Sequence, residues 1–161
     1  MDIIDQAIAF ELEGHKFYLK KTEAAKDSAI KAILTNLADD ELKHAQFLRE
    51  LKAGTAKTFA PTNSMHTIRE ILKKTAVNNL NFLSDELGIR DVCNAALDLE
   101  ERAMNHYSAE AIQSQNPETQ ELLKLLAKEE EKHYHLIQDL INFIDNPKAI
   151  LETQEFQWYD V

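Results

Sequence analysis

The sequence predicts an all-α protein, a bundle of four helices made from two antiparallel helical hairpins. The chain has only 3 Gly and 3 Pro in 161 residues, so few positions break a helix. Apolar residues recur every three or four positions in four long segments, which is the period of an amphipathic helix. The length is enough for a single domain with its own core, spanning residues 1–161.

Short turns join the four helices in pairs. The helices are predicted at about residues 2–26, 28–52, 91–115 and 117–146. Asp27 precedes the second helix as a capping side chain, and Asn116 precedes the fourth, which has Pro117 at its first position. Because both connections are short, each pair forms an antiparallel hairpin, with hairpin repeats over about 2–52 and 91–146.

A long crossover, residues 53–90, joins the two hairpins. It begins with the irregular stretch AGTAKTFAPTNS and continues as a further amphipathic helix over about residues 65–88, which Gly88 ends. Two hairpins joined by one long crossover have the topology of a ferritin-like four-helix bundle. A C-terminal tail covers residues 147–161. Its aromatic residues are expected to dock on the bundle or on a partner subunit, and an exposed aromatic tail would suggest a homodimer; they are Phe156, Trp158 and Tyr159.

An internal repeat with an offset of 89 residues relates the two hairpins. Without gaps, residues 7–52 and 96–141 share ten identities. They include Glu11 with Glu100, Tyr18 with Tyr107, Glu41 with Glu130 and His44 with His133. Leucine-rich helices align easily with one another, but this does not explain why Glu, Glu and His recur at three matched core positions. We interpret the chain as two copies of one hairpin around a pseudo-twofold axis.

The repeated acids and imidazoles lie on helix faces that otherwise carry leucine and alanine, so they are predicted to face the core. Burying one uncompensated carboxylate costs several kcal/mol, and four of them would repel one another. Two divalent cations carry four positive charges and would balance four glutamates, with two neutral imidazoles as further ligands. Such a ligand set suits iron, manganese or zinc. The six candidate metal ligands are Glu11, Glu41, His44, Glu100, Glu130 and His133.

The spacing of these residues supports a metal site. Glu-x-x-His places both side chains on one helix face, one turn apart, where they can bind one metal ion. Two such pairs, each with a matched Glu 30 residues upstream, form the arrangement of di-iron and di-manganese carboxylate proteins. The alternative is a polar core network whose hydrogen bonds are satisfied without metal. Tyr18 and Tyr107 lie two turns after Glu11 and Glu100 and either donate hydrogen bonds to ligand carboxylates or pack in the core.

Other polar residues near the predicted site are less informative. Asp40 and Glu129 are expected to be solvated surface acids, with orientation of the histidine nitrogens as the alternative. The remaining histidines break the repeat and are expected at the surface or its boundary; they are His15, His66, His106 and His135. Gly14 and its repeat partner Ala103 either leave room for a small oxidant or allow close helix packing. Cys93 is interpreted as a small buried residue.

The charge of the chain restricts its partners and location. The net charge is −10, which disfavours nucleic acid and anionic membranes as partners. No apolar run is long enough to cross a bilayer, and the N-terminal segment has acids where a signal peptide has bases. We therefore expect a cytoplasmic protein. A single cysteine excludes an internal disulfide and a Cys-rich iron or zinc module.

Four stretches of the chain resemble the motifs of the rubrerythrin branch of the ferritin-like superfamily. AIAFELEGHKFY and LADDELKHAQFL resemble the first-hairpin motifs, and ALDLEERAMNHY and LAKEEEKHYHLI resemble the second pair. The resemblance implies a non-haem di-iron centre that reacts with dioxygen or hydrogen peroxide, with the six candidate residues as ligands and with Glu41 and Glu130 as bridges. The family has an extra Glu where this chain has Ala103, and that difference brings the centre closer to bacterioferritin or ferritin sites. Classical rubrerythrins also carry a rubredoxin module, for which this chain lacks the cysteines.

We therefore predict an oxidoreductase with two iron ions, or manganese or zinc in their place, that reacts with hydrogen peroxide or dioxygen. Its role would be oxidative-stress defence or iron oxidation, and its electrons would come from a separate donor. One alternative is a ferroxidase or iron-storage protein, which the symmetric ligand set favours. The other is a non-enzymatic helical bundle that binds metal or none.

Overall fold

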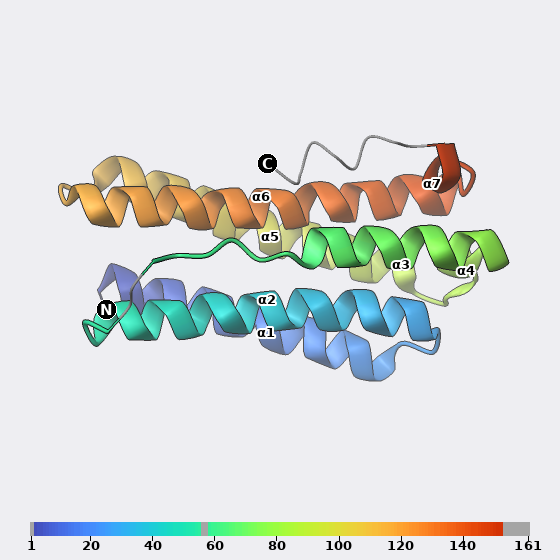
Figure 1. The fold of residues 1–161 in the computed structure, drawn as a ribbon, viewed down its shortest axis with the longest axis horizontal. Coiled ribbons are helices and arrows are strands. Elements are labelled where there is room, and N and C mark those ends of the chain that lie inside the picture. Colours follow the sequence, from blue (N-terminus) through green and yellow to red (C-terminus); the bar gives the residue numbers. More distant parts are fainter. Residues whose placement is uncertain (1, 56–57, 153–161) are drawn as a thin grey trace.

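A computed structural model describes residues 2–55 and 58–152 of the chain. Four long helices form the bundle: α1 (Ile3–Ala24), α2 (Ser28–Lys52), α5 (Ile89–Gln113) and α6 (Pro117–Asp145). The shorter helices are α3 (Ser64–Asn78), α4 (Phe82–Asp85) and α7 (Ala149–Glu152). In Figure 1, the hairpin α1–α2 lies against the hairpin α5–α6, and α3 runs alongside them. The predicted all-α bundle of two hairpins joined by a long crossover is confirmed.

The side chains predicted to cap the helices do so in the structure. Asp27 accepts hydrogen bonds from the backbone N–H groups of residues 29 and 30, at 2.8 and 3.0 Å. Asn116 accepts from residues 118 and 119, and Pro117 occupies the first turn of α6. These bonds satisfy donors that have no partner within the helix, so each turn is short and each hairpin is antiparallel.

The crossover differs from its prediction. The single helix expected over residues 65–88 ends at Asn78, and a separate turn of helix, α4, follows. Asn79 adopts an extended conformation, and its side chain accepts a hydrogen bond from the N–H of Asn81 at 3.2 Å. This local bond competes with the helical pattern, which explains the break. Gly88, with φ at 78°, precedes α5 in the left-handed conformation that glycine tolerates best.

The core is divided into two apolar clusters with a polar centre between them. One cluster includes Tyr18, Leu37 and Ile137, together with residues of α3. The other includes Leu48, Tyr107 and residues of α5 and α6. Each tyrosine is fully buried and belongs to a different cluster. The packing of both hairpins therefore positions a polar centre in the middle of the bundle.

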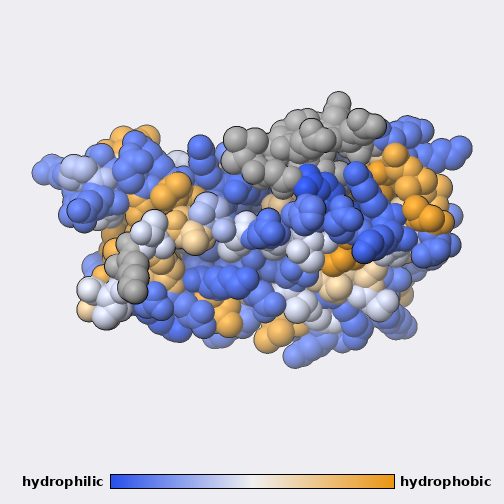
Figure 2. Space-filling model, in the orientation of Figure 1, coloured by the Kyte–Doolittle hydropathy of each residue, from blue (hydrophilic) through white to orange (hydrophobic). Residues whose placement is uncertain are grey.

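The surface is mostly hydrophilic on the face that Figure 2 shows, with apolar residues in separate patches. None of the helices in the described ranges is both long and apolar enough to span a membrane. Cys93 is buried inside α5, as a small apolar residue would be. The aromatic residues of the predicted tail docking, Phe156, Trp158 and Tyr159, lie outside the described residues.

Candidate metal centre

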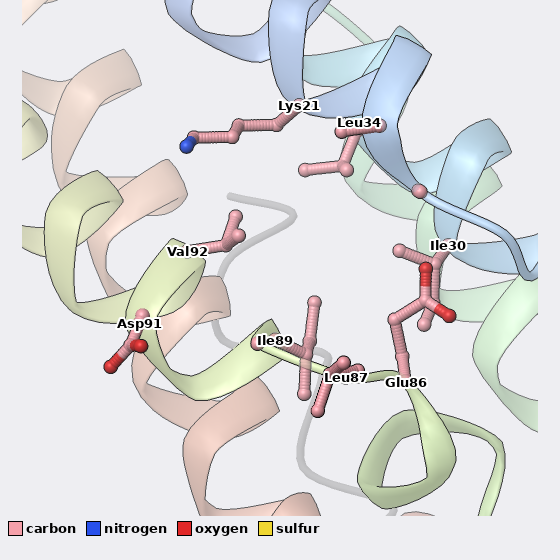
Figure 3. Close-up of a pocket in the computed structure, with 11 residues that line it drawn as sticks. Lys21, Ile30, Leu34, Glu86, Leu87, Ile89, Asp91 and Val92 are labelled. Atoms are coloured by element: carbon pink, nitrogen blue, oxygen red, sulfur yellow. The ribbon is translucent and has the colours of Figure 1, made fainter.

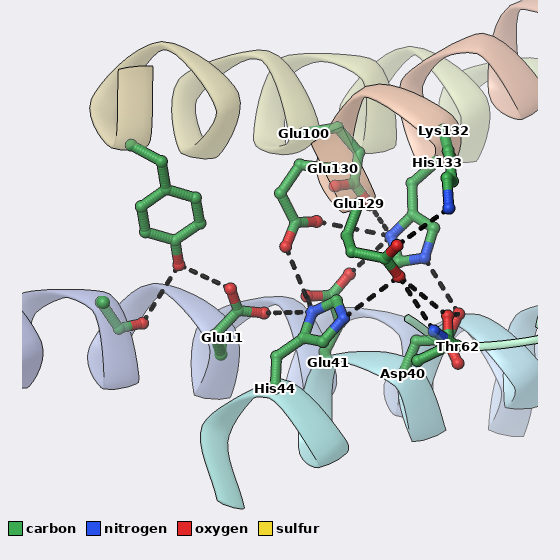
Figure 4. A network of polar contacts seen from close by, with 12 residues as sticks. Glu11, Asp40, Glu41, His44, Thr62, Glu100, Glu129, Glu130, Lys132 and His133 are labelled. Carbon is green, nitrogen blue, oxygen red and sulfur yellow. Dashed lines mark hydrogen bonds and ion pairs between the residues drawn. The ribbon is translucent and has the colours of Figure 1, made fainter. Parts of the chain in front are cut away.

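The structure brings the six predicted ligands together in the middle of the bundle. Glu11 comes from α1 and Glu100 from α5, while α2 and α6 each contribute a Glu-x-x-His pair. All six are at most 2% exposed. Figure 4 shows their carboxylates and imidazoles pointing toward one another. Four buried carboxylates and two imidazoles in one place require positive charge, either from protons or from bound cations.

The ligand atoms fall into two overlapping groups. In each group, one atom from every residue lies within 4.8 Å of the others. The first group is Glu11, Glu41, His44 and Glu130, and the second is Glu41, Glu100, Glu130 and His133. Glu41 and Glu130 belong to both groups. Two adjacent four-ligand sites that share two carboxylates are the geometry of a two-metal centre with bridging glutamates.

Both imidazoles face this centre with the same nitrogen. His44 Nδ1 lies 3.2 Å from Glu11 Oε2 and 3.3 Å from Glu130 Oε1. His133 Nδ1 lies 2.9 Å from Glu41 Oε1 and 3.4 Å from Glu130 Oε2. The two rings are nearly parallel, with centroids 6.2 Å apart. Nδ1 is therefore the ligand atom that each ring offers, and Nε2 points outward.

Two acids lie next to the outward nitrogens. Asp40 Oδ2 is 3.0 Å from His133 Nε2, and Glu129 Oε2 is 3.6 Å from His44 Nε2. The expectation that both acids are solvated is wrong, since Asp40 is 1% and Glu129 3% exposed. The crossover covers the helix faces that carry them, which a helical pattern alone does not reveal. Each acid faces an imidazole of the other hairpin: Asp40 is hydrogen-bonded to His133, whereas Glu129 lies at ion-pair distance from His44 Nε2, which has no hydrogen-bond partner among the described residues. A carboxylate in this place orients an imidazole ligand and increases its basicity.

The tyrosines also bond across the two hairpins. Tyr107 donates a hydrogen bond to Glu11 Oε1 at 2.6 Å, and Tyr18 donates to Glu100. Tyr107 follows Glu100 on α5 but bonds to Glu11 on α1. Tyr18 follows Glu11 on α1 but bonds to Glu100 on α5. The alternative of plain core packing does not describe them, because both hydroxyls bond to candidate ligands. The exchange of partners between α1 and α5 is the pattern that a pseudo-twofold axis produces.

Gly14 allows Glu41 to reach the centre. A Cβ added at Gly14 would lie 3.2 Å from Glu41 Cγ and 3.3 Å from its Cδ, which is tighter than ordinary contact. Of the two expectations for this glycine, the structure therefore supports close packing between α1 and α2. The space that the missing side chain leaves is filled by a candidate bridging ligand.

The carboxylates and imidazoles strongly shift the pKa values of one another. Burial, together with Glu130, Glu100 and Glu11, raises the pKa of Glu41 well above its ordinary value. Burial and the neighbouring glutamates also raise the pKa of Glu130, to about 8. Burial also acts to raise the pKa of Glu11, but the charge of His44 outweighs it and the pKa of Glu11 is lowered to about 2.

The pKa values of the two imidazoles are also raised, by the carboxylates around them. Burial alone would lower the pKa of each ring, but Glu11 beside His44 and Glu100 beside His133 raise both values well above the ordinary one. The centre without metal therefore holds protons on both imidazoles and on shared carboxylates. Cations that bind there replace this positive charge.

The residues present fit a pair of metal ions. Several buried polar atoms of the described residues have no hydrogen-bond partner, and most of them belong to this centre. They include Glu41 Oε1, Glu100 Oε2, both oxygens of Glu130, and His133 Nδ1. Glu41 Oε1 and His133 Nδ1 lie 2.9 Å apart and still form no hydrogen bond. Atoms that converge without bonding to one another are suited to bind a common cation, and oxygen and nitrogen donors suit iron, manganese or zinc.

Sequence reasoning missed the residues of the crossover that touch this centre. Thr62 and Ser64 bond to the outer acids, and Phe59 lies with its ring centroid 5.9 Å from His44. No periodic signal marks these residues, because Phe59 and Thr62 lie in a stretch without regular structure and Ser64 is the first residue of α3. Lys132, which pairs with Glu129 at 2.9 Å, was visible only as a repeat identity with Lys43.

The other histidines lie outside the ligand groups. His66 is exposed, and His15, His106 and His135 are half-buried, in agreement with their expected place at the surface or its boundary. A separate pocket of about 290 Å³ lies at the end of the bundle, near the α1–α2 turn and the start of α5. Most of the side chains that line it are aliphatic, with Lys21, Glu86 and Asp91 as the charged ones (Figure 3), and none of the six candidate ligands lines it.

Comparison with known proteins agrees with this geometry. A search of curated proteins and a search of solved structures each gave no match. The sequence model of the rubrerythrin family matches residues 2–141, which include both hairpins, the crossover and all six candidate ligands. The chain thus belongs to the rubrerythrin family.

Proposed function

We propose that this protein is a di-iron oxidoreductase that reduces hydrogen peroxide or dioxygen. The observation that carries the proposal is the pair of four-ligand groups that share Glu41 and Glu130. Glu11 and His44 would complete one metal position, and Glu100 and His133 the other. Two divalent ions would balance the four glutamates in charge, with the imidazoles neutral.

When bound, two Fe(II) ions would supply one electron each, as the reduction of hydrogen peroxide to water requires two electrons and two protons. The protein would contribute geometry and a dry site. Tyr18 and Tyr107 hold Glu100 and Glu11 in place by hydrogen bonds, and the two apolar clusters exclude water from both ends of the centre. A separate electron donor would return the centre to its reduced form.

The test is metal binding by metal-free protein under anaerobic conditions, followed by addition of peroxide. We expect two Fe(II) ions per chain and consumption of peroxide by the loaded protein. Glu100→Gln should lose one of the two ions, because it removes a ligand of one position only. Glu101→Gln changes an exposed neighbour on the same helix and should retain both ions. Uptake of fewer than two ions by the wild type, or of two ions at unchanged affinity by Glu100→Gln, would contradict the proposal.

One observation favours a second function, that of a ferroxidase. Ala103 stands where the resembled family has an extra glutamate. Each proposed metal position therefore has one unshared Glu and one His. A symmetric centre of this kind suits oxidation of incoming iron. With excess Fe(II) and dioxygen, a ferroxidase would oxidise many iron ions per chain, whereas a peroxide reductase would consume peroxide in the presence of a reductant and oxidise little additional iron.

A further inference from the structure

The crossover passes directly over the candidate metal centre. Residues 58–63, which we term the crossover strap, run along the bundle between α2 and α6 before α3 begins (Figure 1). Phe59 packs edge-on against Phe47, with centroids 5.1 Å apart, and lies 5.9 Å from the ring of His44. The strap therefore touches the centre itself and is more than a connection between the two hairpins.

Thr62 of the strap contacts both outer acids. Its backbone N–H donates to Glu129 Oε2 at 3.2 Å. Its hydroxyl oxygen lies 3.0 Å from the same Glu129 oxygen and 3.1 Å from Asp40 Oδ2. Ser64 adds a hydrogen bond from its own hydroxyl to Asp40 Oδ2. Each acid thus has one crossover donor of its own, and the single hydroxyl proton of Thr62 is shared between two carboxylates from different hairpins (Figure 4).

These contacts break the symmetry of the repeat. Glu129 also pairs with Lys132, which is 17% exposed. In the other hairpin the repeat partner of Lys132, Lys43, is exposed, and the repeat partner of Glu129, Asp40, bonds to hydroxyls instead. The hydroxyls come from the crossover, which has no counterpart in the repeat. The outer acid of each imidazole therefore depends on a residue that neither hairpin contains.

We propose that Thr62 is a positioning residue of the metal centre, because its hydroxyl contacts both acids that face the outer nitrogens of the imidazoles, at 3.0 Å from His133 and 3.6 Å from His44. Loss of its hydroxyl frees Asp40 and Glu129 from one another, and both imidazoles then lose part of their fixed orientation. The inference rests on the proposed metal centre for its consequence, since weaker ligand orientation lowers metal affinity. Removal of such an outer hydrogen bond typically costs about 10- to 100-fold in metal affinity.

The test compares three variants of the whole chain. Thr62→Val removes the hydroxyl and keeps the shape and the backbone N–H, and Thr62→Ser restores the hydroxyl. Thr35→Val is the matched control, because the Thr35 hydroxyl donates locally to the carbonyl of Lys31 on the exposed face of α2. Two quantities are measured: the affinities for two Co(II) ions per chain, and the ¹⁵N resonances of the histidine rings in metal-free protein.

We expect Thr62→Val to bind both ions about 10- to 100-fold more weakly and to shift the ring resonances of both His44 and His133, with His66 unchanged. Thr62→Ser should restore both readouts, and Thr35→Val should alter neither. Wild-type affinity and unshifted rings in Thr62→Val would overturn the inference, even if that variant were less stable. Failure of the wild type to bind two ions would instead overturn the proposed function, and the ring resonances of the metal-free variants would still decide the role of Thr62.

Discussion

Replacing one shared carboxylate by its neutral isostere should stabilise the metal-free protein while removing a ligand of the candidate metal centre. Glu130 is fully buried, and burial together with the charges of Glu11 and Glu100 raises its pKa to about 8. An acid with a raised pKa in the folded state lowers stability at every pH above its pKa in the unfolded chain. Glu130→Gln removes this effect because an amide does not ionise.

The size of the effect follows from the two pKa values. At pH 7 the unfolded chain has ionised Glu130, whose ordinary pKa is 4.5, and the folded chain has not. Each pH unit between 4.5 and 7 costs about 1.4 kcal/mol, so the variant gains about 3 kcal/mol at pH 7. At pH 5 the gain is below about 1 kcal/mol by the same reasoning. This is an upper limit, because His44 Nδ1 and His133 Nδ1 lie 3.3 and 3.4 Å from the carboxylate oxygens, and both imidazoles lose this ion-pair partner in the variant.

The assay is urea denaturation with a chelator present, followed by circular dichroism at pH 5 and pH 7. Glu131→Gln is the control, since Glu131 is an exposed acid on the same helix and its replacement should change the free energy of unfolding by less than about 0.5 kcal/mol. The reasoning is refuted if Glu130→Gln is no more stable than the wild type at pH 7, or if its advantage is the same at both pH values.

Three further outcomes follow from the same centre. Gly14→Ala should leave the metal-free protein as stable as the wild type or up to about 1 kcal/mol more stable, through helix propensity. Its new Cβ would displace Glu41, 3.2 Å away, so metal titration should show weaker binding; unchanged affinity would contradict the close packing. Tyr107→Phe should lower the free energy of unfolding by about 1–3 kcal/mol, because it removes the donor to Glu11 Oε1. Thermal denaturation checks this against Tyr134→Phe on α6, and equal losses in the two variants would refute it. Loading with two divalent ions at pH 7 should release protons, since carboxyls and imidazoles with raised pKa values give them up. Metal affinity should therefore fall as the pH decreases from 8 to 5, and a pH-independent affinity without proton release would show that the centre is not protonated.

The fold was largely predictable from local patterns. The caps at Asp27 and Asn116 and the spacing of apolar residues act within a few positions along the chain, so the four long helices lie within about two residues of their expected bounds. The crossover helix was predicted too long, because the hydrogen bond from Asn81 to Asn79 competes with a helix that the apolar pattern continues. A periodic pattern carries no information about such local competition.

The sequence by itself determined which six residues meet. Glu and His recur at an offset of 89 on core-facing helix positions, and helical geometry is enough to place them on the inner faces of two similar hairpins. Tertiary structure alone decided what surrounds them. Asp40 and Glu129 stand in runs of acids that resemble an exposed helix face, but they are buried between the two hairpins and the crossover, where Thr62 bonds to both. The path of a segment without periodicity depends on packing between distant parts of the chain, and such packing leaves no regular signal in the order of residues.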